Sequence, residues 1–301
     1  MSDDDVAAAV FTAIEAFWRQ AYPAAFGVAW AELKGGIRPL DSGAADGAAL
    51  CIGSPDQITG NAFYCPADDG IVYDTGVLVP VLLDHYGSAG LTAGLAHEFG
   101  HAVAARSGAP DRPLYRELQA DCFAGAALAG LVPADQRVAA LAPLLDFADQ
   151  PTVSPDAATA HGLAVDRAQG ALRGLRDGPA GCSDLGPDDI EPALGRFAAT
   201  TDRNPRTLPP VTVTEADRAL AAPLGDAALA AAGRLEATSG GGAERGCAVG
   251  RWMQGLFGTV GPDRVGGRLT DPDEALNLLR TRPGTDLDLV AGYLDGLAGR
   301  C

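Results

Sequence analysis

Two histidines four residues apart, in the segment HEFGH at residues 97–101, constrain the fold of this chain more than any other feature. Positions i and i+4 lie one turn apart on the same face of an α-helix. The opposite face carries the apolar residues Leu95, Phe99 and Val103. The pattern predicts a helix over residues 91–107 that ends at Gly108, with a buried back and a front that presents His97 and His101 together.

This front face has the residue types of a metal site. His97 and His101 can direct one ring nitrogen each at a single ion, as H-E-x-x-H does in zinc hydrolases. Glu98 follows the first histidine and is rotated by one position, so it can reach a water beside the metal, which is the placement of a general base. The alternative is a helix that happens to carry two surface histidines. The apolar stripe and the defined helix end favour the metal site.

A catalytic zinc takes three protein ligands and keeps one position open. The continuation H-x-x-G-x-x-H is absent, because Ala104 and Ser107 stand where its glycine and last histidine would be. A second helix, expected over residues 111–131, carries Glu117 and Asp121 on one face. Glu117 can be the third ligand, and Asp121 can accept a hydrogen bond from the free ring N–H of a ligating histidine. The alternative for these two carboxylates is a solvated acidic face.

The sequence before the expected HEFGH helix predicts a first helix and a small β-structure. A helix is expected over residues 3–20, started by Ser2 or Asp3, and residues 22–50 are expected to be loop-rich. Short strands near residues 62–64 and 71–73 flank the turn PADDG. The second of these strands is expected to be able to pair with an extended peptide substrate.

The elements after the metal helix are predicted to be helical. The expected ranges are 132–149 with a bend at Pro143, 154–178 started by Ser154 and Pro155, and then 214–235, 247–257, 271–281 and 285–298. The proline-rich run TDRNPRTLPPVTV at residues 201–213 is a predicted linker. We therefore expect an α+β, mostly helical chain: a zincin-like domain at residues 1–200 with a small β-hairpin or sheet, and a helical accessory domain at residues 214–301.

The six cysteines bear on the cellular compartment. None forms a CxxC pair, so disulfides in an oxidising compartment fit better than a thiolate zinc site, the alternative being six buried free thiols. The N-terminus lacks the basic and apolar regions of a signal peptide. We expect an extracytoplasmic protein, secreted or at the cell surface, from which a targeting segment has been removed.

A weak internal similarity predicts the disulfide pairing. Cys122 opens CFAGAALAGL and Cys247 opens CAVGRWMQGL, and each is followed by a helix that closes on another cysteine. The C-terminal domain at residues 214–301, the tail, can therefore be a degenerate repeat of the helical part of the first domain. The expected pairs are Cys122–Cys182, Cys247–Cys301 and, stapling the loop that leads into the hairpin, Cys51–Cys65.

The segments LAHEFGHAV and ELQADCFAGA together resemble the predicted neutral zinc metallopeptidases of bacteria, which have gluzincin-like ligand geometry. The likeness extends over about residues 1–182 and is most specific in ELQADCFAG. It implies that His97, His101 and Glu117 bind zinc, that Glu98 is the base and that Asp121 supports a ligand. Members of that family usually carry an N-terminal membrane or lipoprotein segment, so contact with a membrane is expected only through such a removed segment.

The function expected from these features is hydrolysis of peptide bonds by a water that one zinc ion per chain activates, with Glu98 as general base and a peptide or protein as substrate. His161, Tyr115 and Tyr73 are candidates to stabilise the oxyanion. A packing or capping role is the alternative for His161. The net charge of −17 argues against nucleic acid as a partner. The alternative function is a catalytically silent extracellular binding protein that keeps its zinc.

Overall fold

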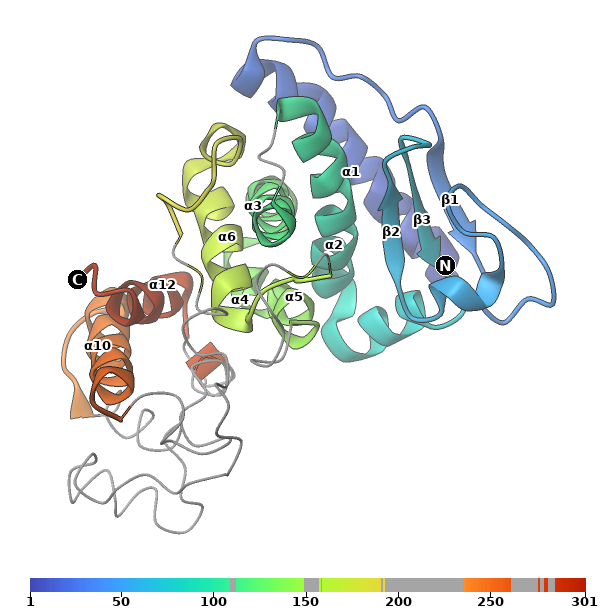
Figure 1. Ribbon diagram of the computed structural model, residues 1–301. Coiled ribbons are helices and arrows are strands. Elements are labelled where there is room, and N and C mark those ends of the chain that lie inside the picture. Colours follow the sequence, from blue (N-terminus) through green and yellow to red (C-terminus); the bar gives the residue numbers. More distant parts are fainter. Residues whose placement is uncertain are drawn as a thin grey trace. The chain divides into compact units, whose positions relative to one another are not determined.

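The computed structural model forms two compact units, Met1–Phe147 with Gly170–Ile190, and Ala148–Gln169 with Glu191–Cys301. It is mostly helical and has one three-stranded sheet, which confirms the α+β expectation at this level (Figure 1). The predicted linker 201–213 lies outside the described residues. The same holds for all of the predicted helix 214–235 except Leu235, and for most of 271–281. The described residues are 1–108, 112–148, 159–190, 237–260 and 285–301, with the single positions 157, 192, 235, 276, 279 and 280.

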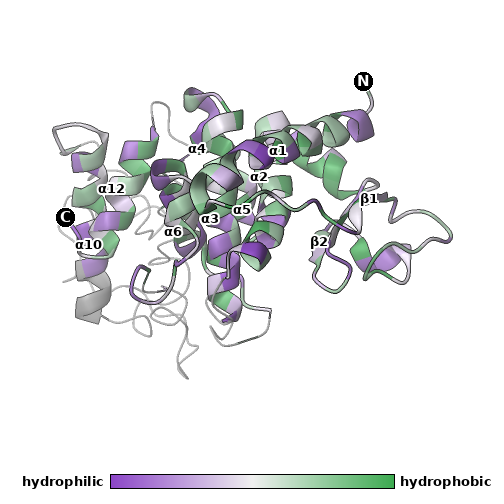
Figure 2. Ribbon diagram, turned by 90° about the horizontal axis from the view of Figure 1, so that it is seen from above, coloured by the Kyte–Doolittle hydropathy of each residue, from purple (hydrophilic) through white to green (hydrophobic). Residues whose placement is uncertain are grey.

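Helix α1, Asp3–Phe26, is longer than predicted. Ser2 caps it, because its hydroxyl accepts from the Asp5 N–H at 3.2 Å while the Asp5 carboxylate accepts from the Ser2 N–H at 2.9 Å. Figure 2 shows hydrophilic residues at this start of the helix. The helix continues to a left-handed C-cap at Gly27, and it buries a stripe made of Ala7, Phe11, Ile14, Trp18 and Tyr22.

The sheet contains one strand more than the sequence predicts. Strands β2, Ala62–Cys65, and β3, Gly70–Asp74, form the expected hairpin, and β1, Gly36–Leu40, pairs in parallel with β3. The prediction of loop over residues 22–50 is wrong at β1, a short, partly exposed strand with a proline that fits its edge position. Because the strand order is β1-β3-β2, β3 is central, so the prediction that it can pair with a peptide is also wrong.

The two faces of the sheet pack against different parts of the first unit. Tyr73 on β3 is buried and its ring lies 5.0 Å from that of Phe11 on α1. Val72 points to the other face and joins a core cluster with Ile52, Ile58 and Cys65. The Cys51–Cys65 disulfide ties the preceding loop to the edge of β2, as expected.

A buried carboxylate joins β3 to the helix that follows it. Asp74 is fully buried and accepts hydrogen bonds from backbone N–H groups of the loops around it and of the helix start. Burial opposes its charge, but the amide donors outweigh this effect and lower the pKa of the carboxyl. The end of β3 and the start of the helix are therefore fixed to one anion. The donors are Ser42, Gly60, Gly76, Val77 and Leu78.

Helix α2, Leu78–Ser107, carries the HEFGH segment. Its backbone is interrupted at Gly87, where φ is 67°, so the predicted helix 91–107 is the part beyond this kink. The helix ends at Gly108 in the left-handed conformation, with φ of 82°, as expected. α2 lies between the sheet on one side and α3, Pro113–Leu131, on the other (Figure 1). The predicted cap Asp111 of α3 is outside the described residues.

Two later predictions are wrong in their boundaries. The range 132–149 contains a 3-10 turn and two short helices, α4, Arg137–Ala140, and α5, Ala142–Asp146. The break falls at Leu141, and Pro143 lies in the first turn of α5. Helix α6, Ala164–Asp177, starts about ten residues later than the start signals at Ser154 and Pro155 suggest. Those two residues lie outside the described part of the chain.

The described end of the chain consists of two helices, α10, Gly242–Val260, and α12, Leu287–Leu297. The Cys247–Cys301 disulfide joins α10 to the C-terminus, and Cys122–Cys182 joins α3 to the segment after α6. Both are the pairings that the internal similarity predicts. Among the helices that the structure describes, none has the length and apolar character needed to cross a membrane.

Candidate metal centre

A glycine between the two histidines brings α2 and α3 together. A Cβ at Gly100 would lie 2.9 Å from the Cα of Ala120 and would also collide with the Ala120 carbonyl. Any side chain at position 100 would therefore push the helices apart. Because Ala120 lies between Glu117 and Asp121 on α3, this contact sets the two carboxylates opposite His97 and His101.

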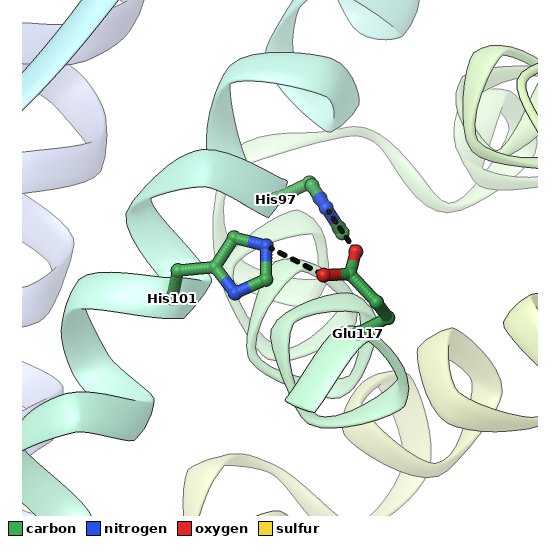
Figure 3. Close-up of side chains that lie close together, drawn as sticks. All are labelled: His97, His101 and Glu117. Carbon is green, nitrogen blue, oxygen red and sulfur yellow. Dashed lines mark ion pairs between the residues drawn. The ribbon is translucent and has the colours of Figure 1, made fainter. Parts of the chain in front are cut away.

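His97, His101 and Glu117 converge on one point between the helices (Figure 3). Their nearest ligand atoms all lie within 4.8 Å of one another. The Glu117 carboxylate spans the two rings, with 3.4 Å from Oε2 to His97 Nε2 and 3.6 Å from Oε1 to His101 Nε2. Two ligands of a tetrahedral zinc, each about 2.1 Å from the ion, are about 3.4 Å apart. The three side chains that the sequence predicts as ligands are thus brought together at the spacing of a metal site.

One oxygen of this ligand set lacks a hydrogen bond and could be stabilised by a cation. Glu117 Oε2 is buried and has no hydrogen-bond partner among the described residues. Leaving a buried charged oxygen unpaired is costly. Burial by itself would raise the pKa of Glu117, but the adjacent rings of His101 and His97 hold the pKa of this carboxyl well below its usual range. The site therefore holds an ionised carboxylate that two imidazoles alone do not saturate.

Asp121 fixes the orientation of one ligand. It is fully buried, and its Oδ1 lies 2.7 Å from His97 Nδ1. Since an ionised carboxylate only accepts hydrogen bonds, the proton of the ring is assigned to Nδ1. With a metal ion held at the convergence point, this tautomer would offer the lone pair of His97 Nε2 to the ion. Asp121 contacts the histidine in the manner the sequence predicts.

Glu98 follows the ligand candidate His97 on α2, and its carboxylate is held from the sheet. Its Oε2 accepts a hydrogen bond from the backbone N–H of Tyr64 on β2 at 2.9 Å. Among the residues that the structure describes, no other donor reaches this carboxylate, so Oε1 is available to a water. The contact also shows that the edge of β2 that is not paired with β3 faces α2, the helix that carries His97 and His101.

Two other candidates from the sequence, Tyr115 and Tyr73, make contacts away from the three ligands. The Tyr115 hydroxyl donates to the Ile190 carbonyl at 2.9 Å, and Tyr73 is buried against Phe11 in the core, so neither is directed at the ligands. His85 is exposed and stacks near Tyr86. His161 is exposed, lies in the second unit, and its role in the reaction stays a prediction.

Sequence reasoning did not find the contribution of Tyr64 or Gly100. The Tyr64 contact is made by a backbone amide, which has no sequence signature beyond its place on a predicted strand. Gly100 is visible inside HEFGH, and a glycine in the middle of a helix is a signal of close packing that could have been used.

No protein-family model, curated protein or solved structure matches this chain.

Proposed function

We propose that the chain is a zinc-dependent peptidase of the extracytoplasmic space, with His97, His101 and Glu117 as zinc ligands and Glu98 as general base. The observation that carries the proposal is the convergence of these three ligands on one point, with Glu98 following the first of them in the chain. Two histidines and a glutamate are a ligand set of catalytic zinc, and the buried Glu117 oxygen that accepts no hydrogen bond supports binding of a cation.

The side chains fit roles in hydrolysis of an amide. When bound, zinc acts as a Lewis acid on the scissile carbonyl and acidifies water. Glu98 removes the proton of the attacking water through Oε1 and delivers it to the leaving amine. Asp121 keeps the His97 ring in the tautomer that a ligand needs.

The three disulfides support the proposed location. All six cysteines are paired, and disulfides persist in oxidising compartments. The resemblance of LAHEFGHAV and ELQADCFAGA to bacterial neutral zinc metallopeptidases supports the proposed peptidase activity.

Elemental analysis of protein purified without added metal, followed by digestion of a broad peptide library with and without chelator, tests the proposal. We expect one zinc per chain, cleavage that the chelator abolishes, and loss of both zinc and cleavage in His101→Ala. His85→Ala is the matched control, because this exposed histidine precedes the kink in the same helix. Absence of zinc from the wild type would refute the site. Zinc without cleavage would favour the alternative, a silent binding protein.

A further inference from the structure

We propose that the ion pair between Arg106 and Asp69 is a positioning device that holds the edge strand β2, and through it Glu98, in place beside the metal ligands. The inference rests on the proposed function and adds to it two residues that lie outside the ligand set. It follows from a closed ring of contacts that begins and ends on helix α2.

The first half of the ring runs from the base to the sheet. Glu98 Oε2 accepts from the Tyr64 N–H at 2.9 Å. The side chain of the same tyrosine reaches the turn that follows β2, where its hydroxyl donates to Asp69 Oδ1 at 3.0 Å. Asp69 lies in the turn between β2 and β3, where its φ of 48° is left-handed. One residue therefore connects the base with the turn, through its amide at one end and its hydroxyl at the other.

The second half runs from the turn back to the helix. Arg106 Nη2 donates to both oxygens of Asp69, at 2.8 and 2.9 Å, and both side chains are largely shielded, with 13% and 18% exposed. Arg106 follows Glu98 by eight residues, so the two lie about two turns apart along α2. The strand is thus tied to one helix at two points.

Arg106 is itself held rigidly. Its Nη1 donates to the Ala102 carbonyl at 2.8 Å and its Nε to the Ala31 carbonyl at 3.0 Å. The guanidinium lies 4.8 Å from the centre of the Trp30 ring, and Trp30 stacks on Phe99 of α2. An arginine fixed by these contacts can act as a support, which distinguishes it from a mobile surface charge.

The charge of Asp69 is stabilised in this arrangement. Burial raises the pKa of its carboxyl, but the hydrogen bonds from Arg106 and from the Lys34 N–H outweigh burial, and the net effect is a lowered pKa. The ion pair is therefore intact at neutral pH. Its loss would free the turn, let β2 move away from α2, and remove the donor that orients Glu98.

The test combines kinetics with hydrogen exchange in Asp69→Asn. Asparagine tolerates a left-handed backbone, so the turn is kept while the charge is removed. We expect kcat to fall about 10-fold, within the range that misplacement of a reacting group causes, with a smaller change in KM and with zinc content unchanged. The Tyr64 amide should exchange about 5-fold faster as its hydrogen bond opens more often. Tyr64→Phe, which removes only the hydroxyl, should change both quantities in the same direction.

Asp295→Asn is the matched control, since it makes the same change of side chain in an ion pair with Arg300 on the surface of the second unit. It should leave both readouts unchanged. Arg106→Lys is the second variant if Asp69→Asn does not fold, because lysine keeps the positive charge but lacks the planar set of N–H donors of the guanidinium.

Unchanged exchange at Tyr64, or unchanged kcat despite faster exchange, overturns the positioning role. A wild-type protein without cleavage refutes the proposed function instead. The exchange measurement then still decides whether the ion pair between Arg106 and Asp69, the clamp, holds β2 against α2.

Discussion

Helix α3 packs against α6, and α10 packs against α12, through the same kind of contact: glycines on each helix meet the backbone of the other. In every case an added Cβ would collide with a carbonyl oxygen across the pair. Equivalent positions are 125 residues apart on α3 and α10, and 122 residues apart on α6 and α12. The equivalent contacts are Gly125 to Ala171 and Gly250 to Tyr293, Gly174 to Cys122 and Gly296 to Cys247, and Gly170 to Leu118 and Gly292 to Ala243.

The two pairs differ at the positions of the proposed metal ligand Glu117 and of Asp121. Counted by the same shift, Glu117 corresponds to Gly242 and Asp121 to Gly246. A side chain at Gly246 would collide with the Leu289 carbonyl, so an aspartate has no room there. Both helix pairs thus share a framework of glycine contacts and a disulfide. The carboxylates proposed to take part in the chemistry are found only in the first pair, on the face of α3 that is turned toward α2. The likeness supports reading the tail as a degenerate repeat.

The largest effect should come from Glu98→Gln on α2, the helix that faces the carboxylates of α3. Glutamine keeps the acceptor for the Tyr64 amide but cannot take a proton, so cleavage should fall by at least about 100-fold while zinc and fold remain. Glu244→Gln makes the same change on α10, where this carboxylate only accepts from the Gly241 N–H, and should leave turnover unchanged. Equal turnover of Glu98→Gln and the wild type would remove Glu98 from the mechanism.

Asp121→Asn should weaken zinc binding about 10–100-fold, because the amide no longer holds the His97 ring as the charged carboxylate does. Competition with a chelator of known affinity measures this. Asp295→Asn on α12, which removes an exposed ion pair with Arg300, is the control and should bind zinc like the wild type. If both variants bind zinc equally, the contact between Asp121 and His97 does not support the metal.

The sequence was sufficient to predict the features that depend on local periodicity. The spacing of His97 and His101 on one helix, and of Glu117 and Asp121 on the next, predicts which side chains share a face, and the structure places these faces together. The repeated cysteine pattern gave the disulfides. Both inferences need only the geometry of a helix and a chain that returns on itself.

Features that depend on tertiary contacts were not predictable in this way. Strand β1 has five residues and a proline, so nothing in its own pattern marks it, and it becomes a strand by pairing with β3. The hydrogen bond from the Tyr64 amide to Glu98 joins residues 34 positions apart through a backbone atom. The clamp from Arg106 to Asp69 spans 37 positions, and in the sequence both residues look like ordinary surface charges.

A smaller effect is expected from alanine at the equivalent glycines 174 and 296. Each new methyl group would press on a cysteine carbonyl in the facing helix, and overpacking of this kind costs about 1–3 kcal/mol of unfolding free energy. Both Gly174→Ala and Gly296→Ala should therefore unfold at lower denaturant concentration. Only Gly174→Ala should also weaken zinc binding, since α6 supports the helix that carries Glu117. Loss of zinc affinity in both variants would mean that the second pair contributes to the site.

The smallest effect should follow from Gly242→Glu, which restores a carboxylate at the position equivalent to Glu117. A zinc site needs at least three ligands of suitable type, and all four histidines of the chain lie at or before residue 161. In addition, a Cβ at this position would lie 2.5 Å from Asp286 Oδ1, so the new side chain meets a carboxylate and no imidazole. Elemental analysis should still give one zinc per chain, with unchanged cleavage. A second zinc would show that α10 and α12 retain a metal-binding face, and the separation of framework from chemistry would then be wrong.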